Sequence, residues 1–500
     1  MPTSRIFWRG GKRWRHGAER RRIRRTPATR PIVVKKALAV FAAVGLLLVL
    51  AGWGLFAAFG WRFYPAPRIE KVAAPKDRAE AVRQDLEVLA LLPTVDRSFP
   101  VETLGKFESE RRKLLASADT LTPAALEMNV SRLVAIAGNG HTTVGRRLRR
   151  LQRVPIRLAW FDEGLFVVRT TDAHAKLLGA QVVAINGKAP EALLAGFVAF
   201  VSGPKENAKA TSPLLLESPT ALSGVWPEMD ASRIEITVRT PAGEALTTRL
   251  EGVPPDPKAV YAGPARSLAP QRMKGETEPW RNLLSDRPDL PLVLRDADAS
   301  VYVTKLDEGK GLYIHLNQVA GDERGALSEQ LKAILAGLAP ASLRFAILDL
   351  RFNGGGDYTE TLKFTKELPR RVADDGKIFI LTDNSTFSAA LVTMARAKHF
   401  AGTRAVVLGE RVGDRERFWA EGSAPIELPN SKILVFFATG YHDWNEGCGW
   451  KDWARCFWLN YAFDVPAGDL APKSPMAWRF EDYRKGVDTV LEEALRQARN

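Results

Sequence analysis

Two short segments in the C-terminal half of the chain carry residues that together suit acyl transfer. The first is the glycine turn Asn353–Gly356, and the second is Ser388, which opens an expected helix. Glycines let backbone N–H groups approach a ligand closely and adopt positive φ angles. A serine in the first turn of a helix lies where unpaired N–H groups and the helix dipole favour developing negative charge. The pattern predicts Ser388 as a nucleophile, with an oxyanion hole from the backbone N–H groups of Gly355 and Ala389.

Both segments follow apolar runs of the kind that form buried strands. Residues 345–350 precede the glycine turn, and Ile378–Leu381 precede the serine, which enters a helix expected from Phe387 to about Lys398. These strand–turn–helix units predict an α/β core over residues 300–500. Taken alone, the pattern also fits two ordinary βα units joined by a glycine-rich turn.

Five motifs occur in a fixed order within residues 78–498. They are Gly138–Thr142, Leu178–Ala180 with Val183–Gly187, Asp349–Gly356, Thr386–Ala390 and Glu481–Asp488. Together they resemble the serine peptidase superfamily that contains the C-terminal-processing (tail-specific) proteases and the tricorn protease. The resemblance implies an α/β catalytic core of crotonase/Clp-protease-like type, with an N-terminal helical region and a β-rich, PDZ-like insert. It implies hydrolysis of a peptide or protein substrate, and nothing in the sequence indicates a metal or an organic cofactor.

A serine nucleophile needs a neighbouring base, and the superfamily offers two solutions. Tail-specific proteases use a lysine just after a Gly-Glu strand end, but here Gly409-Glu410 is followed by residues 411–415 without a lysine. Arginine cannot replace it, because arginine stays protonated in proteins. The tricorn branch uses a serine, a histidine and a glutamate. That resemblance assigns His141 as the base and Glu446, 58 residues after Ser388, as the acid.

Alternatives remain open at each of these positions. His442, four residues before Glu446, is the rival base, and Asp443 is the rival acid. His141 also fits a purely structural role in which it holds the helical region on the core. Because the lysine is absent and Gly179-Ala180 replaces the Gly-Asp common in PDZ-like loops, a non-catalytic binding protein at the membrane is the alternative function.

The charge distribution indicates a membrane anchor. The net charge is +15, but residues 1–36 alone carry ten arginines and three lysines against one glutamate. This basic arm precedes the 25 uncharged residues Ala37–Trp61, about 37 Å of helix at 1.5 Å per residue. The positive-inside rule then predicts a single-pass anchor in the inner membrane, with residues 1–36 in the cytoplasm and the catalytic body in the periplasm. Nucleic-acid binding is disfavoured, because the excess charge ends at the apolar stretch.

The two cysteines agree with export. Cys448 and Cys456 are the only cysteines and lie eight residues apart, so we expect a disulfide between them. The same segment is rich in tryptophan, and we expect these indoles to pack around the disulfide rather than line an apolar specificity pocket. The tryptophans are Trp419, Trp444, Trp450, Trp453 and Trp458.

The sequence predicts seven parts along the chain. It does not indicate an oligomeric state. Leu121-Thr122-Pro123 is an expected helix start, and the proline-rich connection is long enough to fold over the active site. The parts are a basic arm (1–36), a membrane helix (37–61), a linker (62–77), a helical region (78–149), a β-rich PDZ-like domain (150–252), a proline-rich connection (253–299) and the α/β catalytic domain (300–500).

Overall fold

The computed structural model of the protein describes residues 31–256, 264–272 and 279–500. The chain divides into two compact units, Met1–Phe59 and Gly60–Asn500. The first described helix, α1, runs from Pro31 to Phe63, and its segment Val40–Phe63 is long and apolar enough to cross a membrane. Most of the predicted basic arm, residues 1–30, lies outside the described residues.

The predicted helical region contains four helices around one apolar core. Proline stands at the first position of α5, and the Thr122 side chain accepts a hydrogen bond from Ala125 N, as expected for this helix start. The buried side chains of these helices also pack against Ile426, Leu428 and Val435 of the C-terminal part. The helices are α2 (Arg78–Leu89), α3 (Leu92–Val95), α4 (Val101–Ala116) and α5 (Pro123–Ala135).

An antiparallel sheet follows, in the order β2-β3-β4-β5-β6 with β7 beside β3. Three helices lie between β4 and β5, where a run of strands was expected. The buried residues in 190–225 recur at helical spacing rather than at every second position. The strands are β2 (Ile156–Phe161), β3 (Gly164–Thr171), β4 (Gln181–Ile185), β5 (Arg233–Arg239), β6 (Ala245–Glu251) and β7 (Trp280–Asn282), and the helices are α6 (Pro190–Phe197), α7 (Lys205–Leu216) and α8 (Pro219–Val225).

The described parts of the proline-rich connection form a core of their own. Helix α9 (Pro264–Leu268), Leu284 and Val293 pack against Phe166 of the antiparallel sheet and against Tyr483 of α14 (Phe480–Tyr483). These apolar residues of the connection are buried between the antiparallel sheet and the C-terminal segment. Residues 257–263 and 273–278 lie outside the described residues.

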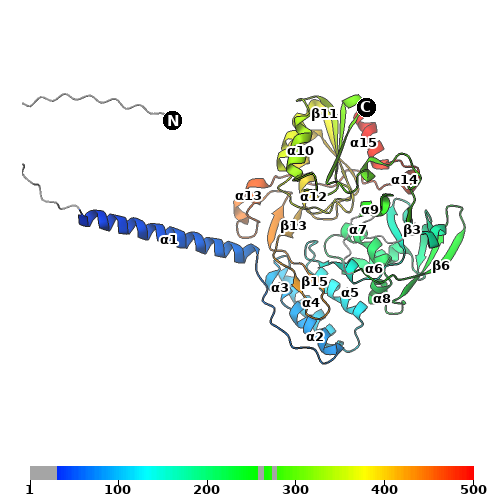
Figure 1. Ribbon diagram of the computed structural model, residues 1–500, viewed down its shortest axis with the longest axis horizontal. Helices are drawn as coiled ribbons and strands as arrows, with labels where there is room; N and C mark the ends of the chain where they lie inside the picture. Colours follow the sequence, from blue (N-terminus) through cyan, green and yellow to red (C-terminus); the bar gives the residue numbers. More distant parts are fainter. Residues whose placement is uncertain (1–30, 257–263, 273–278) are drawn as a thin grey trace, which may run out of the picture. The chain divides into compact units, whose positions relative to one another are not determined.

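A mixed five-stranded sheet forms the C-terminal core, in the order β12-β11-β10-β9-β8. All neighbours are parallel except β8 and β9. Helix α15 covers one face, and Figure 1 shows α10 on the other side of the sheet from α15. The elements are β8 (Val301–Leu306), β9 (Gly311–Leu316), β10 (Leu343–Asp349), β11 (Val372–Thr382), β12 (Ala405–Gly409), α10 (Leu327–Ala336), α11 (Leu362–Glu367), α12 (Ala389–Ala401) and α15 (Thr489–Arg499).

A buried ion cluster fastens α15 to the end of β10. Arg351 donates to Asp349 and, through both terminal nitrogens, to Asp488 at 2.8 and 2.6 Å. Asp488 also accepts the first free N–H groups of α15. Removing one partner would leave a buried charge unpaired, which typically costs about 3–5 kcal/mol. The motifs Asp349–Gly356 and Glu481–Asp488 are far apart in sequence, and the ion pair between Arg351 and Asp488 joins them.

The chain after β12 forms several short strands. Strand β13 pairs with β16, and β15 pairs with both β14 and the earlier strand β1. Through β1, the residues just after His141 are held against the C-terminal part. The elements are β1 (Val144–Gly145), β13 (Arg417–Ala420), β14 (Ile426–Glu427), β15 (Leu434–Val435), β16 (Gly440–Asp443) and α13 (Asn460–Phe463).

Candidate active site

Ser388 occupies a strained turn between β11 and α12. Its backbone has φ 55° and ψ −123°, a region that residues other than glycine rarely enter. It is the residue immediately before α12, and its side chain makes no capping hydrogen bond with the helix. The Ser388 hydroxyl is therefore not used to cap α12, while the unpaired N–H groups of the helix start beside it.

The glycine turn after β10 lies directly against Ser388. A Cβ atom added to Gly355 would stand 2.7 Å from Ser388 Cβ and 3.0 Å from Ala389 N. Gly355 also has φ +106°, which disfavours any side chain there. The structure therefore brings together Ser388, Gly355 and Ala389, the predicted nucleophile and oxyanion-hole residues.

The hydrogen bonds of the turn refine the predicted oxyanion hole. Gly355 N donates to Asn353 Oδ1 at 2.9 Å, and Asn353 Nδ2 donates to Leu316 O at 2.8 Å. For Gly355 to hold an oxyanion, its N–H must leave Asn353. Ala389 N, by contrast, is at the first position of α12, where helical N–H groups have no partner within the helix.

Asp383 ties the glycine turn to the serine turn. Its Oδ1 accepts hydrogen bonds from Phe352 N at 3.1 Å, Ser385 N at 3.0 Å and Thr386 Oγ1 at 3.2 Å. Thr386 Oγ1 also donates to Leu350 O at 2.9 Å. Burial, with a contribution from the Glu410 charge, raises the pKa of Asp383 to about 7. This carboxyl group thus fixes the two turns while carrying a proton near neutral pH.

Asp383→Asn is expected to stabilise the protein at pH 8 but not at pH 4. Asp383 is protonated in the folded chain up to about pH 7, whereas its ordinary pKa is 3.8, so folding loses stability as the pH rises from 4 to 7. The full difference corresponds to an upper value on the order of 4 kcal/mol. Asparagine keeps the accepting Oδ1 without the charge. Unfolding midpoints of the detergent-solubilised chain at both pH values test this, and an equal change at pH 4 and pH 8 would contradict it.

His141 is placed by its neighbours in the motif Gly138–Thr142. Asn139 exchanges two hydrogen bonds with the backbone of Trp419 in β13, at 2.9 and 3.1 Å. Thr142 donates to Asp96 Oδ2 at 2.5 Å, and the same oxygen accepts Ala438 N. Gly140 allows close approach, since a Cβ there would meet the Phe387 ring at 2.7 Å. The motif therefore sets His141 against the segment that carries Ser388.

The His141 ring packs between aromatic neighbours, stacked on Phe418 and tilted against Phe387. Its centroid lies 4.8 Å from that of Phe387, the residue before Ser388, and 5.1 Å from that of Phe418 in β13. Among the described residues, no hydrogen bond joins His141 to the Ser388 hydroxyl. Catalytic hydrogen bonds are often long in unliganded enzymes and shorten when substrate binds.

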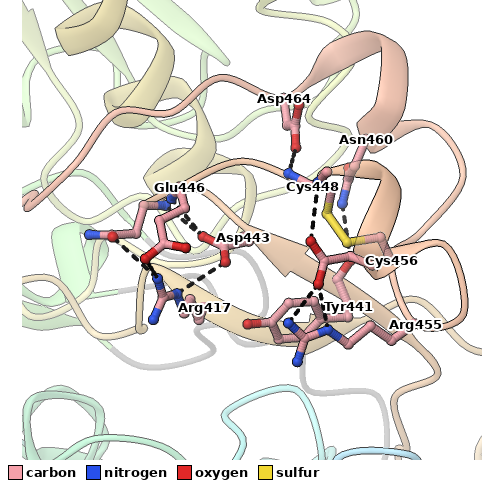
Figure 2. Close-up of a disulfide and its surroundings, with 12 residues drawn as sticks. Arg417, Tyr441, Asp443, Glu446, Cys448, Arg455, Cys456, Asn460 and Asp464 are labelled. Atoms are coloured by element: carbon pink, nitrogen blue, oxygen red, sulfur yellow. Dashed lines mark hydrogen bonds and ion pairs between the residues drawn. A yellow bond between two sulfur atoms is a disulfide. The ribbon is translucent and has the colours of Figure 1, made fainter.

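The carboxylate that contacts His141 is Asp414, not the predicted Glu446. His141 Nε2 lies 3.1 Å from Asp414 Oδ2, and the Asp414 side chain is only 1% exposed. Glu446 is 63% exposed and pairs with Arg417 at 2.6 Å. Asp443, the rival acid, also binds Arg417 and accepts Glu446 N (Figure 2). Arg417 thus holds both predicted acids in a separate ion cluster.

His442, the rival base, is enclosed by aromatic rings. It is 1% exposed and stacks on Phe418 at 4.8 Å. The nearest carboxylate oxygen, Glu421 Oε1, is 3.5 Å away, which is too long for a normal hydrogen bond. Burial lowers the pKa of His442. This environment favours a neutral imidazole that is enclosed by rings and shielded from solvent.

Asp414 was missed by the reasoning from sequence, although its position carried a signal. It lies in residues 411–415, just after the Gly409-Glu410 strand end, where tail-specific proteases have their lysine. An acidic residue at this strand end could pair with His141. The two residues are 273 positions apart, however, and local sequence does not predict a contact over that separation.

The tertiary structure also forms the predicted disulfide, Cys448–Cys456 (Figure 2). Among the nearby tryptophans, Trp444 is fully buried as expected, and Arg396 lies 5.1 Å from its ring centroid. Trp450, Trp453 and Trp458 are exposed instead, so these three indoles do not pack around the disulfide.

No protein-family model matches the sequence, and no curated protein matches it significantly. Solved structures do match. Mature CPAF complexed with lactacystin aligns with a TM-score of 0.53 at 13% identity, over 84% of this chain and 97% of that chain. A second structure of mature CPAF gives a TM-score of 0.50 at 13% identity, over 82% and 94% of the two chains.

Two further solved structures match more weakly. The photosystem II D1 C-terminal processing protease has a TM-score of 0.32 at 14% identity, over 81% of this chain and 94% of that chain. Tricorn protease has a TM-score of 0.34 at 13% identity, over 84% and 37%. The resemblance drawn from the motifs is thus confirmed at the level of the fold: the chain has the fold of CPAF, a member of the tail-specific and tricorn-like serine protease group.

Proposed function

We propose that the protein is a membrane-anchored serine endopeptidase that hydrolyses peptide bonds in exported polypeptides. The observation that carries the proposal is the strained Ser388 at the start of α12, in contact with Gly355. The strained backbone of Ser388 does not stabilise the fold, since such a conformation costs about 1–3 kcal/mol of folding free energy. Such strain is retained where it aims a side chain at a reacting group.

In this mechanism Ser388 attacks the carbonyl carbon of the scissile peptide bond. His141 takes the proton from the serine hydroxyl and later gives it to the leaving amine. Asp414 orients the imidazole and stabilises its protonated form, in the role that the sequence resemblance gave to Glu446. The oxyanion is held by Ala389 N–H together with a backbone N–H of the glycine turn.

The anchor and the compartment belong to the same proposal. Helix α1 contains the apolar segment Val40–Phe63, and the basic residues precede it. The positive-inside rule then places the body, from about residue 64 onward, in the periplasm across the inner membrane. A disulfide between Cys448 and Cys456 suits that oxidising compartment.

Labelling with a serine-reactive fluorophosphonate tests the proposed chemistry. We expect the full chain in detergent to be labelled, Ser388→Ala to lose the label completely, and His141→Ala to lose nearly all of it. His442→Ala serves as the control for a general loss of ring packing. Labelling that survives in Ser388→Ala would place the nucleophile elsewhere.

Two observations favour the alternative of a non-catalytic binding protein. In the described residues His141 and Ser388 share no hydrogen bond, and Gly355 N–H is engaged by Asn353. If the folded wild-type chain is not labelled under any condition, including with excess peptide, the binding role replaces the enzymatic one.

A further inference from the structure

Four large aromatic side chains are exposed in one short loop. We call residues 448–461 the Trp loop. In it Trp450 is 88% exposed, Trp453 70%, Trp458 48% and Tyr461 43%. A soluble monomer rarely exposes so many large apolar groups together, and such patches mark contact surfaces.

The Trp loop is held in place from behind. The Cys448–Cys456 disulfide closes it (Figure 2). Asp452 accepts a hydrogen bond from Gly449 N and binds Arg455 at 2.8 Å. At its far end, Asn460 donates to Tyr441 O at 3.1 Å and is fully buried. The exposed indoles therefore belong to a loop that is fixed by its disulfide and by its buried polar groups, and Phe457 is the aromatic residue of the loop that is buried.

The same loop adjoins the end of the apolar helix. Phe63, the last residue of α1, contacts Phe457 edge to face with ring centroids 5.3 Å apart. Thr439 Oγ1 donates to Phe63 O at 2.6 Å. These contacts lie within the unit Gly60–Asn500. Trp458 follows Phe457 directly, and Trp61, in the last turn of α1, is 74% exposed.

We infer that the Trp loop docks in the headgroup region of the lipid bilayer from which α1 emerges. The inference rests on the proposed membrane anchor. Tryptophan and tyrosine favour this region because each combines an apolar ring with a polar N–H or O–H group. The exposed Lys451 adds a basic group, since long basic side chains reach lipid phosphates while their stems remain in apolar surroundings. The body is then held at two points, the helix and the loop.

Contacts with α12 place the loop away from the nucleophile. Phe463 O, just beyond the Trp loop, accepts hydrogen bonds from Arg396. Arg396 is eight residues after Ser388 on α12, about 12 Å along the helix at 1.5 Å per residue. The position near Phe63 and the mixture of indole and basic groups favour a lipid surface over a peptide substrate.

Site-specific fluorescence in proteoliposomes tests the docking. Because the only two cysteines form the disulfide, a single introduced cysteine takes a thiol-reactive dye selectively. The full chain would carry Ala462→Cys, next to Tyr461, or the control Glu244→Cys at the exposed turn between β5 and β6. Both would be reconstituted in vesicles of phosphatidylethanolamine and phosphatidylglycerol, with nitroxide-labelled lipids as quencher. A matched set would add Trp450→Ser, Trp453→Ser and Trp458→Ser.

We expect strong quenching at position 462, little at 244, and a fall at 462 to the level of 244 in the triple serine variant. Equal quenching at 462 and 244 in the wild-type background would overturn the inference. So would a dye at 462 that is shielded from aqueous iodide but not quenched by the lipids, which would reveal a protein neighbour.

Two further readouts separate this inference from the proposed function. Extraction of the chain by alkaline carbonate would overturn the anchor and the docking together. Fluorophosphonate labelling of Ser388 is scored independently, so a failure of the peptidase proposal leaves the quenching result intact.

Discussion

Gly355→Ala is expected to abolish fluorophosphonate labelling and peptide hydrolysis while the chain still folds. The added Cβ would stand 2.7 Å from Ser388 Cβ and 3.0 Å from Ala389 N, and the alanine would have to keep φ +106°. The glycine turn must therefore move away from the nucleophile. Loss of one oxyanion-hole donor typically lowers turnover by about 10²–10³-fold, and displacement of the serine adds to that loss.

Gly354→Ala is the matched control for this prediction. A Cβ at position 354 meets no atom within 4 Å, and Gly354 is not among the residues with positive φ. The variant keeps every backbone N–H of the turn, so we expect labelling rates close to those of the wild type. Rates of labelling and circular dichroism spectra should be measured for both variants. Equal activity of the two would show that the turn does not form the oxyanion hole.

Asp414→Asn is expected to lower the labelling rate by up to about 10⁴-fold, because an amide can hold the imidazole in the wrong tautomer. Asp414 contacts His141 Nε2 at 3.1 Å with a side chain that is 1% exposed. The effect should fall on kcat rather than KM, since Asp414 acts on the base and not on the substrate.

Glu446→Gln is the control that distinguishes the structure from the resemblance. Glu446 is 63% exposed, and its ion pair with Arg417 is of a kind that contributes about 0–1 kcal/mol. We expect its activity to match the wild type. The reverse result, an inactive Glu446→Gln beside an active Asp414→Asn, would restore the Ser-His-Glu triad and show that the loop moves to reach His141 during turnover.

Local features of this protein followed from local sequence. The Thr122–Pro123 helix start, the strand before the glycine turn and the helix after Ser388 each depend on residues within one or two turns. The disulfide followed as well, because the chain has only two cysteines and they lie eight residues apart. The PDZ-like and crotonase-like assignments stay predictions.

The partner of His141 and the surface of the Trp loop were decided by tertiary structure alone. Asp414 reaches His141 because β1 pairs with β15 and Asn139 binds Trp419, and these contacts join segments about 280 residues apart. Burial of Trp444 and exposure of Trp453 likewise depend on which of these side chains packs against the rest of the folded chain. Sequence alone determined which groups are available for chemistry, since side-chain type and local backbone preference belong to each segment. Which groups meet depends on long-range pairing and burial, and only the folded chain sets these.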